Sequence, residues 1–151
     1  MRRSLVAPSA RGRWLLAAAL ALSTQAGWAA DCTVGSQGVS FGSYDVFSAQ
    51  SLDGVGTISL SCDESVEYTL SLSAGGGSYA SRAMASGANT LAYNLYIDAT
   101  YTAIWGDGTG NTATVSSSGT AADHTIYGRI PARQNVAVGS YSDTITVEIE
   151  F

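Results

Sequence analysis

Alternation of apolar and polar residues is the feature that most constrains the fold of this chain. Apolar side chains occupy every second position from Ile145 to Phe151, with Thr and Glu between them. The same period of two recurs over residues 57–62, 66–73 and 91–98. This period is typical of half-buried β-strands, and no window beyond the N-terminal segment shows the 3.6-residue period of a helix. The pattern therefore predicts an all-β fold.

Turn-forming residues separate these runs. They are concentrated in four short segments: Asp53-Gly54, Gly75-Gly76-Gly77, Gly106-Asp107-Gly108 and Gly139-Ser140. Shorter strands are expected at residues 32–34, 39–41 and 125–130. Residues 107–123, rich in Gly, Ser, Thr and Ala, are expected to form a mobile loop or a weak hairpin. Antiparallel strands with one polar face imply two sheets packed face to face, so we expect a single β-sandwich.

The N-terminal segment has the layout of a secretory signal peptide. Four arginines flank the start of the apolar run 14–22, and a mostly small and polar stretch follows it up to Ala29. The apolar run is too short to span a bilayer. We expect cleavage after Ala29 or Ala30, with residues 1–30 as the signal peptide and residues 31–151 as the domain. An uncleaved membrane anchor is the alternative.

Charge is distributed unevenly between these two parts. The whole chain has a formal charge of −5 and contains no lysine. Residues 1–30 hold four of the seven arginines and none of the acids, so the exported domain would have a formal charge of about −9. Such a surface repels nucleic acid and anionic lipid, and neither is an expected partner. The 46% share of hydrophobic residues is enough for a core, which excludes general disorder.

Export would place the two cysteines, Cys32 and Cys62, in an oxidising compartment, where a disulfide between them is the plain inference. Closing a loop of about thirty residues stabilises a fold by roughly 3–4 kcal/mol in the loop-entropy model. A metal site is the alternative, but structural zinc takes four ligands and His124 is the only histidine. We therefore expect no metal and no cofactor.

The final strand runs to Phe151, so we expect it to have no later segment to pair with. A long apolar strand at a sheet edge promotes association unless something covers it. Pairing with residues 39–41, or with another internal strand, is the alternative.

Few side chains could support catalysis. His124 beside Asp123 is better explained as a surface histidine than as a general base. Glu148 and Glu150 share a strand face, as two glycosidase acids could, but the alternation turns both toward solvent. The glycine triplet at 75–77 opens no helix, which argues against a phosphate loop. The sequence therefore predicts that this protein is not an enzyme.

The motif Trp105-Gly106-Asp107-Gly108 could suggest a sugar-stacking site or a calcium loop. Calcium needs six or more oxygen ligands, and only Asp107 and Asn111 are close by. We expect Asp107 to make an Asx-type turn and Trp105 to pack on the rim of the sandwich.

Several motifs, weak one by one, carry a family resemblance in their order along the chain. They are Cys32-Thr33-Val34, Phe41-Gly42-Ser43-Tyr44, Cys62, Arg82-Ala83-Met84, the run 91–98, Trp105-Gly106-Asp107-Gly108, Tyr127-Gly128-Arg129-Ile130-Pro131, Gln134, the run 139–144, Val147 and Phe151. With these motifs the chain resembles the spore coat protein U domain family, the fold of secreted subunits in archaic chaperone–usher pili. The resemblance covers nearly all of residues 31–151.

This resemblance implies an incomplete immunoglobulin-like β-sandwich that lacks its final strand. A periplasmic pilus chaperone, and then the N-terminal donor strand of a neighbouring pilus subunit, would fill the acceptor groove, and an outer-membrane usher would be a further partner. By analogy, the groove and the chaperone-binding strand would include Ile145, Val147, Ile149 and Phe151, with Phe151 near the point where a chaperone anchors the carboxylate. Cys32 and Cys62 would tie the first strand to the second.

The resemblance also implies export through the periplasm to the cell surface, a role in adhesion and biofilm formation, and no small-molecule substrate. After cleavage only one or two residues would precede Cys32, too few for a donor strand. We therefore expect a terminal or minor subunit, or a secreted spore or cell-surface coat protein, rather than a shaft subunit.

Two other classes of protein stay open as alternatives. The first is an extracellular carbohydrate-binding module with Trp105, Tyr101 and Tyr79 as stacking residues. The second is a hydrolase that uses Glu148 or Asp143. A structural subunit should aggregate or need a partner when it is expressed alone, whereas a lectin or an enzyme should be stable without one.

Deletion of residues 145–151 tests the expectation of a chaperone-dependent surface subunit, because it removes the strand that a chaperone would bind. We expect the shortened protein to lose chaperone-dependent export, measured as its amount in the periplasm and medium beside the full chain. Normal secretion of the shortened protein would contradict this expectation.

Overall fold

The computed structural model describes residues 30–151, and these form strands without any helix. The strands are β1 (Cys32–Ser40), β2 (Leu52–Leu72), β3 (Arg82–Ser86), β4 (Asn89–Tyr96), β5 (Ile104–Trp105), β6 (Thr112–Ala113), β7 (Val115–Ile130) and β8 (Val147–Glu150). A search of the same residues for a helix able to span a membrane finds none. Apart from Ala30, the predicted signal peptide lies outside the described residues.

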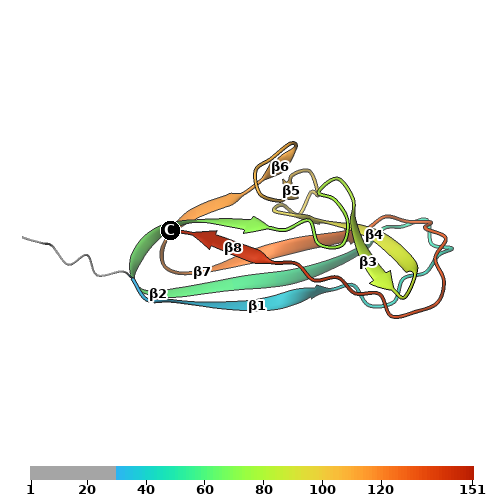
Figure 1. Cartoon of the computed structure of the whole chain (residues 1–151), viewed down its shortest axis with the longest axis horizontal. Helices are drawn as coiled ribbons and strands as arrows, with labels where there is room; N and C mark the ends of the chain where they lie inside the picture. Colours follow the sequence, from blue (N-terminus) through green and yellow to red (C-terminus); the bar gives the residue numbers. More distant parts are fainter. Residues whose placement is uncertain (1–29) are drawn as a thin grey trace, which may run out of the picture.

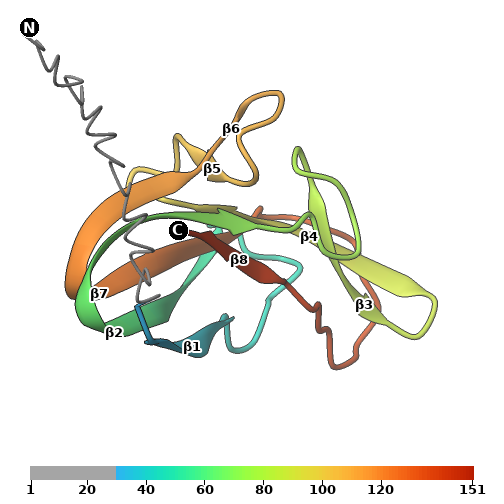
Figure 2. The same ribbon diagram turned by 60° about the vertical axis from the view of Figure 1, so that its left-hand side comes forward.

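The two longest strands, β2 and β7, form the frame of the fold. They pair antiparallel from Leu52 opposite Ile130 to Leu70 opposite Val115. Between Ser61 and Val66 the register shifts, because β2 has more residues than β7 over this interval. Such a bulge bends a strand pair. Figure 2 shows the bend at one end of the molecule, where both strands leave one layer of the sandwich and enter the other.

Strands β1 and β8 lie along the same edge of β2, on either side of this bend. Ile58 pairs with β7 on one edge and with β1 on the other, and Leu70 likewise pairs with β7 and with β8. Because β2 bends, β1 belongs to one layer and β8 to the other, and the two strands point in opposite directions (Figure 1). The other strands extend the sheet beyond β7, in the order β4, β5 and β6, with β3 beside β4.

The core lies between the two layers, and most of its side chains come from the predicted inward faces. Ile58 and Leu60 come from one half of β2, and Tyr68, Leu70 and Leu72 from the other half. The remaining core side chains are Met84, Leu91, Tyr93, Leu95, Trp105, Ile126 and Ile130. The predicted all-β, immunoglobulin-like sandwich is thus confirmed. One detail differs, since β5 and β6 pair parallel rather than antiparallel.

The turn predicted at Asp53-Gly54 is wrong, because both residues lie inside β2. Gly54 pairs with Gly128 of β7, and the two glycines serve packing instead. A Cβ on Gly54 would lie 2.6 Å from the backbone oxygen of Ser40, and a Cβ on Gly128 would lie 2.6 Å from Cζ of Phe41. The absence of these side chains lets the end of β1 and the ring of Phe41 settle onto the inner face of the sheet.

The loop predicted over residues 107–123 is also wrong in its second half, because Val115 begins β7. The small polar residues there pair with β2 on both sides of the bulge, and the Thr69 and Ser116 hydroxyl groups lie 3.0 Å apart in a hydrogen bond. The composition is that of a loop, but the backbone pairing with a long neighbouring strand determines the conformation.

Other boundaries differ less. The short strands expected at residues 32–34 and 39–41 merge into β1, which ends at Ser40, and the two runs at 57–62 and 66–73 form the single strand β2. The sequence pattern gave no strand at the position of β3. The last strand is shorter than expected and begins at Val147.

Substitution Gly128→Ala should destabilise the domain by about 1–3 kcal/mol, because the new Cβ would overlap the Phe41 ring and the side chain of Val39. Urea unfolding followed by tryptophan fluorescence measures this change. The matched control is Gly38→Ala in β1, where a Cβ meets nothing within 4 Å. Equal unfolding midpoints for the two variants would contradict the packing role of Gly128.

An open groove as the candidate functional site

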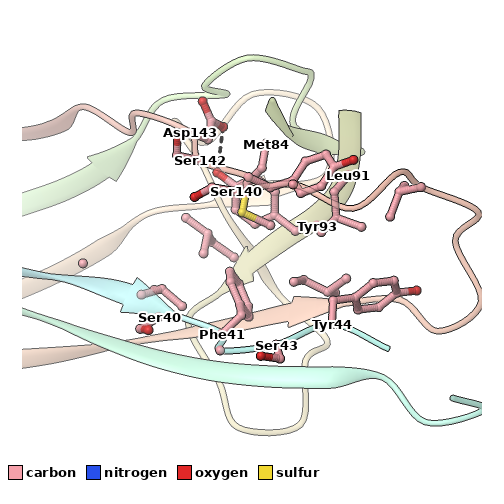
Figure 3. Close-up of a pocket in the computed structure, with 18 of the residues that line it drawn as sticks. Ser40, Phe41, Ser43, Tyr44, Met84, Leu91, Tyr93, Ser140, Ser142 and Asp143 are labelled. Atoms are coloured by element: carbon pink, nitrogen blue, oxygen red, sulfur yellow. Dashed lines mark hydrogen bonds between the residues drawn. The ribbon is translucent and has the colours of Figure 1, made fainter. Parts of the chain in front are cut away.

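A groove of about 930 Å³ lies on the open side of the sandwich. One wall is the end of β1 with the segment that follows it, residues 36–47. The other wall is formed by residues 136–143 with Ile145 and Val147, which lead into β8. Figure 3 shows side chains from both walls and from the strand behind them turned into this space.

The floor of the groove is the hydrophobic core itself. Its apolar members are Leu72, Met84, Leu91, Tyr93, Leu95, Ile126 and Ile130. Phe41 enters from the first wall, and its ring meets that of Tyr93 edge to face, with 5.9 Å between the ring centres. Each of these seven floor side chains is at most 8% exposed, so the groove runs directly over the packed core.

Both walls carry a strand edge without a partner. Within residues 30–151, the strand pairing of β1 and that of β8 are each confined to β2. Val34 lies opposite the buried Leu60 and therefore on the inward face of β1, yet it is 50% exposed. Phe151, which follows β8, is 68% exposed. The open side thus continues past the groove along the full length of both strands.

A tyrosine and a glutamine form hydrogen bonds at the end of the groove where the first wall leaves β1. The Tyr44 hydroxyl donates to the backbone oxygen of Pro131 at 2.8 Å and accepts from the backbone nitrogen of Gln134 at 2.8 Å. The Gln134 side chain bonds both the backbone nitrogen and the oxygen of Ala92, each at 2.8 Å, as a neighbouring strand would. These four bonds fix the first wall to the segment that leads into the second wall, and they fix that segment to β4.

Asp143 anchors the second wall to the floor. Its carboxylate accepts a hydrogen bond of 2.7 Å from the Tyr93 hydroxyl and one of 3.0 Å from the backbone nitrogen of Gly76. Burial, and next the bond to Asp143, raise the pKa of Tyr93 above its ordinary value, so the hydroxyl stays protonated and remains a donor. A Cβ on Gly75 would collide with this carboxylate, which explains a glycine in that turn.

Arg82, at the start of β3, lies wholly inside the protein. Its guanidinium donates to the backbone oxygens of Ser73 (2.8 Å) and Trp105 (2.6 Å) and to the side-chain oxygen of Asn94 (2.6 Å). Burial lowers the pKa of Arg82 from its ordinary value. This arginine joins three chain segments beneath the groove, and the sequence pattern gave no hint of that role beyond its place in a motif.

The residues predicted for the acceptor strand divide into two groups. Ile145 and Val147 line the groove. Ile149 packs partly buried against the core beyond the groove, and Phe151 lies exposed at the end of the chain. Strand β8 lies at an edge of the sheet, and its residues Val147–Glu150 pair with the internal strand β2. Residues 39–41 do not pair with it but lie across the groove from it.

The predicted disulfide between Cys32 and Cys62 is present, with an S–S distance of 2.07 Å. The two residues are direct partners in the pairing of β1 with β2, so the bond fixes the start of the first wall to the frame.

The aromatic residues expected to face a ligand are largely engaged within the protein. Trp105 is 1% exposed and donates from Nε1 to the backbone oxygen of Leu70, so neither the predicted rim position nor sugar stacking holds for it. The Arg129 guanidinium lies 3.5 Å from the centre of the Tyr101 ring and covers one face of it. Tyr79 is partly buried, and the guanidinium of Arg82 lies 5.5 Å from its ring centre.

The side chains considered for catalysis or for calcium binding either contact other parts of the protein or face solvent. His124 Nε2 lies 2.8 Å from the Tyr68 hydroxyl, and burial lowers the pKa of His124. Glu148 and Glu150 are exposed, as the alternation predicted. Asp107 holds its own turn by accepting from the backbone nitrogen of Thr109 at 2.9 Å. No cluster of three or more metal-ligating side chains occurs in the part of the chain that the structure describes.

Together these features define a class of protein: a β-sandwich with an apolar groove between two strand edges that lack partners. A family model described as the Spore Coat Protein U domain matches residues 17–148, and the chain belongs to that family. It is 33% identical over 138 residues to Protein U of Myxococcus xanthus, across 80% of this chain and 77% of the relative.

A solved structure gives a second comparison. It is the chaperone–tip adhesion subunit pre-assembly complex CsuC–CsuE from archaic chaperone–usher Csu pili of Acinetobacter baumannii. The similarity to one of its chains has a TM-score of 0.61 and 25% sequence identity, and it covers 82% of this chain. This chain spans 40% of the length of that one.

Substitution Arg82→Ala should destabilise the domain by about 3–5 kcal/mol, because it removes the guanidinium that donates to three acceptors inside the protein. Thermal unfolding by circular dichroism measures the loss. The matched control is Arg133→Ala at an exposed loop position, which should change stability by less than about 0.5 kcal/mol. Similar losses for both variants would contradict a special role for the buried arginine.

Proposed function

We propose that this protein is a structural, non-catalytic subunit of an extracellular fibre that is assembled by strand exchange. In this proposal the groove accepts one extended segment of a partner. A periplasmic chaperone supplies that segment before assembly, and a neighbouring subunit supplies it within the fibre. The single observation that carries the proposal is the apolar groove between β1 and β8, each of which has an unpaired edge.

The backbone geometry supports a strand as the occupant. An added strand would find hydrogen-bonding groups on both walls, which a small molecule or a globular ligand would leave unpaired. Because β1 and β8 point in opposite directions, the inserted strand would run parallel to one wall and antiparallel to the other (Figure 1). It would complete the sandwich with one further strand.

The side chains in the groove support an occupant with alternating apolar residues. Every second residue of an inserted strand would face the floor of Leu, Ile, Met and Tyr side chains, and the residues between would face solvent. The acidic side chains along the groove are Asp45 and Asp143, and both already accept backbone hydrogen bonds, Asp45 from within its own wall and Asp143 from Gly76. Recognition would therefore depend on shape and apolar contact rather than on charge.

The comparisons with known proteins also support a subunit of an extracellular fibre. Membership of the Spore Coat Protein U domain family, together with similarity to a chain of a chaperone–subunit complex, favours a chaperone and an outer-membrane usher as partners. They also favour export through the periplasm to the cell surface. A role in adhesion and biofilm formation, and a terminal or minor position in the fibre, are further parts of the proposal.

A secreted coat protein is the second candidate, and the description of the family as the Spore Coat Protein U domain favours it. The acceptor groove would serve either assembly. Co-purification of the exported chain with the products of neighbouring genes separates the two, because the fibre requires a chaperone and an usher. A carbohydrate-binding module has less support, since Trp105 is buried and Arg129 covers one face of Tyr101.

Extension of the chain beyond Phe151 tests the proposal directly. A short turn followed by a strand of about ten residues, with Val at alternate positions, would return along β8 into the groove. We expect the melting temperature to rise by at least about 10 °C, because several apolar side chains become buried. Differential scanning calorimetry measures the rise, and light scattering should show less aggregation than the unextended chain.

The control is the same extension with Ser in place of each Val, which can pair through its backbone but cannot fill the floor. The two extensions should differ by most of the measured rise. If the Val and Ser extensions leave the melting temperature equally unchanged, the groove does not accept a strand and the proposal fails.

A further inference from the structure

Met84 is the one methionine among residues 30–151, and it lies in the floor of the groove. It belongs to β3, opposite Leu91 of β4, with its side chain turned into the hollow that Phe41 enters from the other wall (Figure 3). The residue is 8% exposed, and that exposure opens onto the groove. A small hydroperoxide that enters the empty groove therefore meets this side chain.

The surroundings of Met84 make the chemical state of this sulfur important for the groove. The next residue, Ala85, forms a two-way backbone bridge with Ser142 of the second wall, at 2.8 and 3.1 Å. The Tyr93 hydroxyl, the nearby polar group on β4, already donates to Asp143. A new polar atom on Met84 would thus project into the apolar part of the floor at the point where the second wall joins β3.

We propose that Met84 is an oxidation site that controls the ability of the empty groove to take up a strand, an inference that rests on the proposed function. The oxidant is a hydroperoxide. The sulfur lone pair attacks one peroxide oxygen, the O–O bond breaks, and the sulfur is oxidised by two electrons to the sulfoxide. The peroxide is reduced, and its second oxygen leaves with a proton as water or an alcohol.

The sulfoxide opposes strand insertion because it converts an apolar surface into a strong acceptor. An apolar strand residue that covers it would remove its oxygen from water without offering a donor. A strand already in the groove has the reverse effect, because it shields the sulfur from the oxidant. Free subunits are therefore sensitive to peroxide and assembled subunits are protected.

The test uses the exported domain, hydrogen peroxide and a synthetic peptide with the Val-alternating strand sequence described above. Peptide mass spectrometry measures the oxygen added to Met84, and fluorescence anisotropy of the labelled peptide measures its capture. We expect complete Met84 sulfoxide to weaken capture at least about tenfold. In the chain extended by the Val strand, Met84 should oxidise at least about tenfold more slowly than in the unextended chain.

The matched variant is Met84→Leu, which keeps a similar volume but has no sulfur. Whatever affinity this variant has for the peptide before treatment, peroxide should leave that affinity unchanged. Treatment of the oxidised parent with methionine sulfoxide reductase should restore capture, which general damage to the fold would not permit. Undiminished capture by fully oxidised parent, or equal oxidation rates with and without the added strand, would overturn the proposal.

Failure of the proposed function gives a different result. In that case the unoxidised parent and the Met84→Leu variant both fail to capture the peptide, whatever the state of Met84. The oxidation proposal falls with it, and the two failures are distinguished by the unoxidised samples alone.

Discussion

The pairing of β2 with β7 is the constraint on which the rest of this fold depends. The two strands remain partners from one layer to the other and turn together at the bulge between Ser61 and Val66. Because one strand pair supplies the centre of both layers, the edge of β2 that faces away from β7 also passes through both. The first and last strands attach to that one edge, β1 on one side of the bend and β8 on the other. The open side of the sandwich is the space between them.

Hydrogen bonds made beside the groove hold its shape, rather than apolar contacts between side chains inside it. Asp143 and the Tyr44–Gln134 pair fix the walls with short hydrogen bonds, and Arg82 joins three segments below the floor. Hydrogen bonds of this kind are directional, whereas apolar contacts are not. A free subunit can therefore present a groove of defined shape before any strand has entered it.

Sequence periodicity predicted the strands with a clean inward face, such as those with Ile58 and Leu70, because a core on one side produces a period of two. It failed where small residues serve pairing or close approach. Gly54 suggested a turn but makes room for the end of β1, and the Ser-rich start of β7 suggested a loop but pairs with β2. Trp105 was expected at the rim, because sequence spacing cannot show that a two-residue strand carries it into the core.

For the groove, the sequence predicted one wall and missed most of the other parts. Ile145 and Val147 were identified by alternation and by family resemblance, and both line the hollow. The polar network was not predictable from spacing, since Asp143 meets Gly76 and Tyr93 only after chain segments far apart in sequence come together. The motif containing Arg82 and Met84 had no assigned purpose in the sequence. The fold gives these two residues different contacts, since the arginine bonds three chain segments inside the protein and the methionine lines the groove.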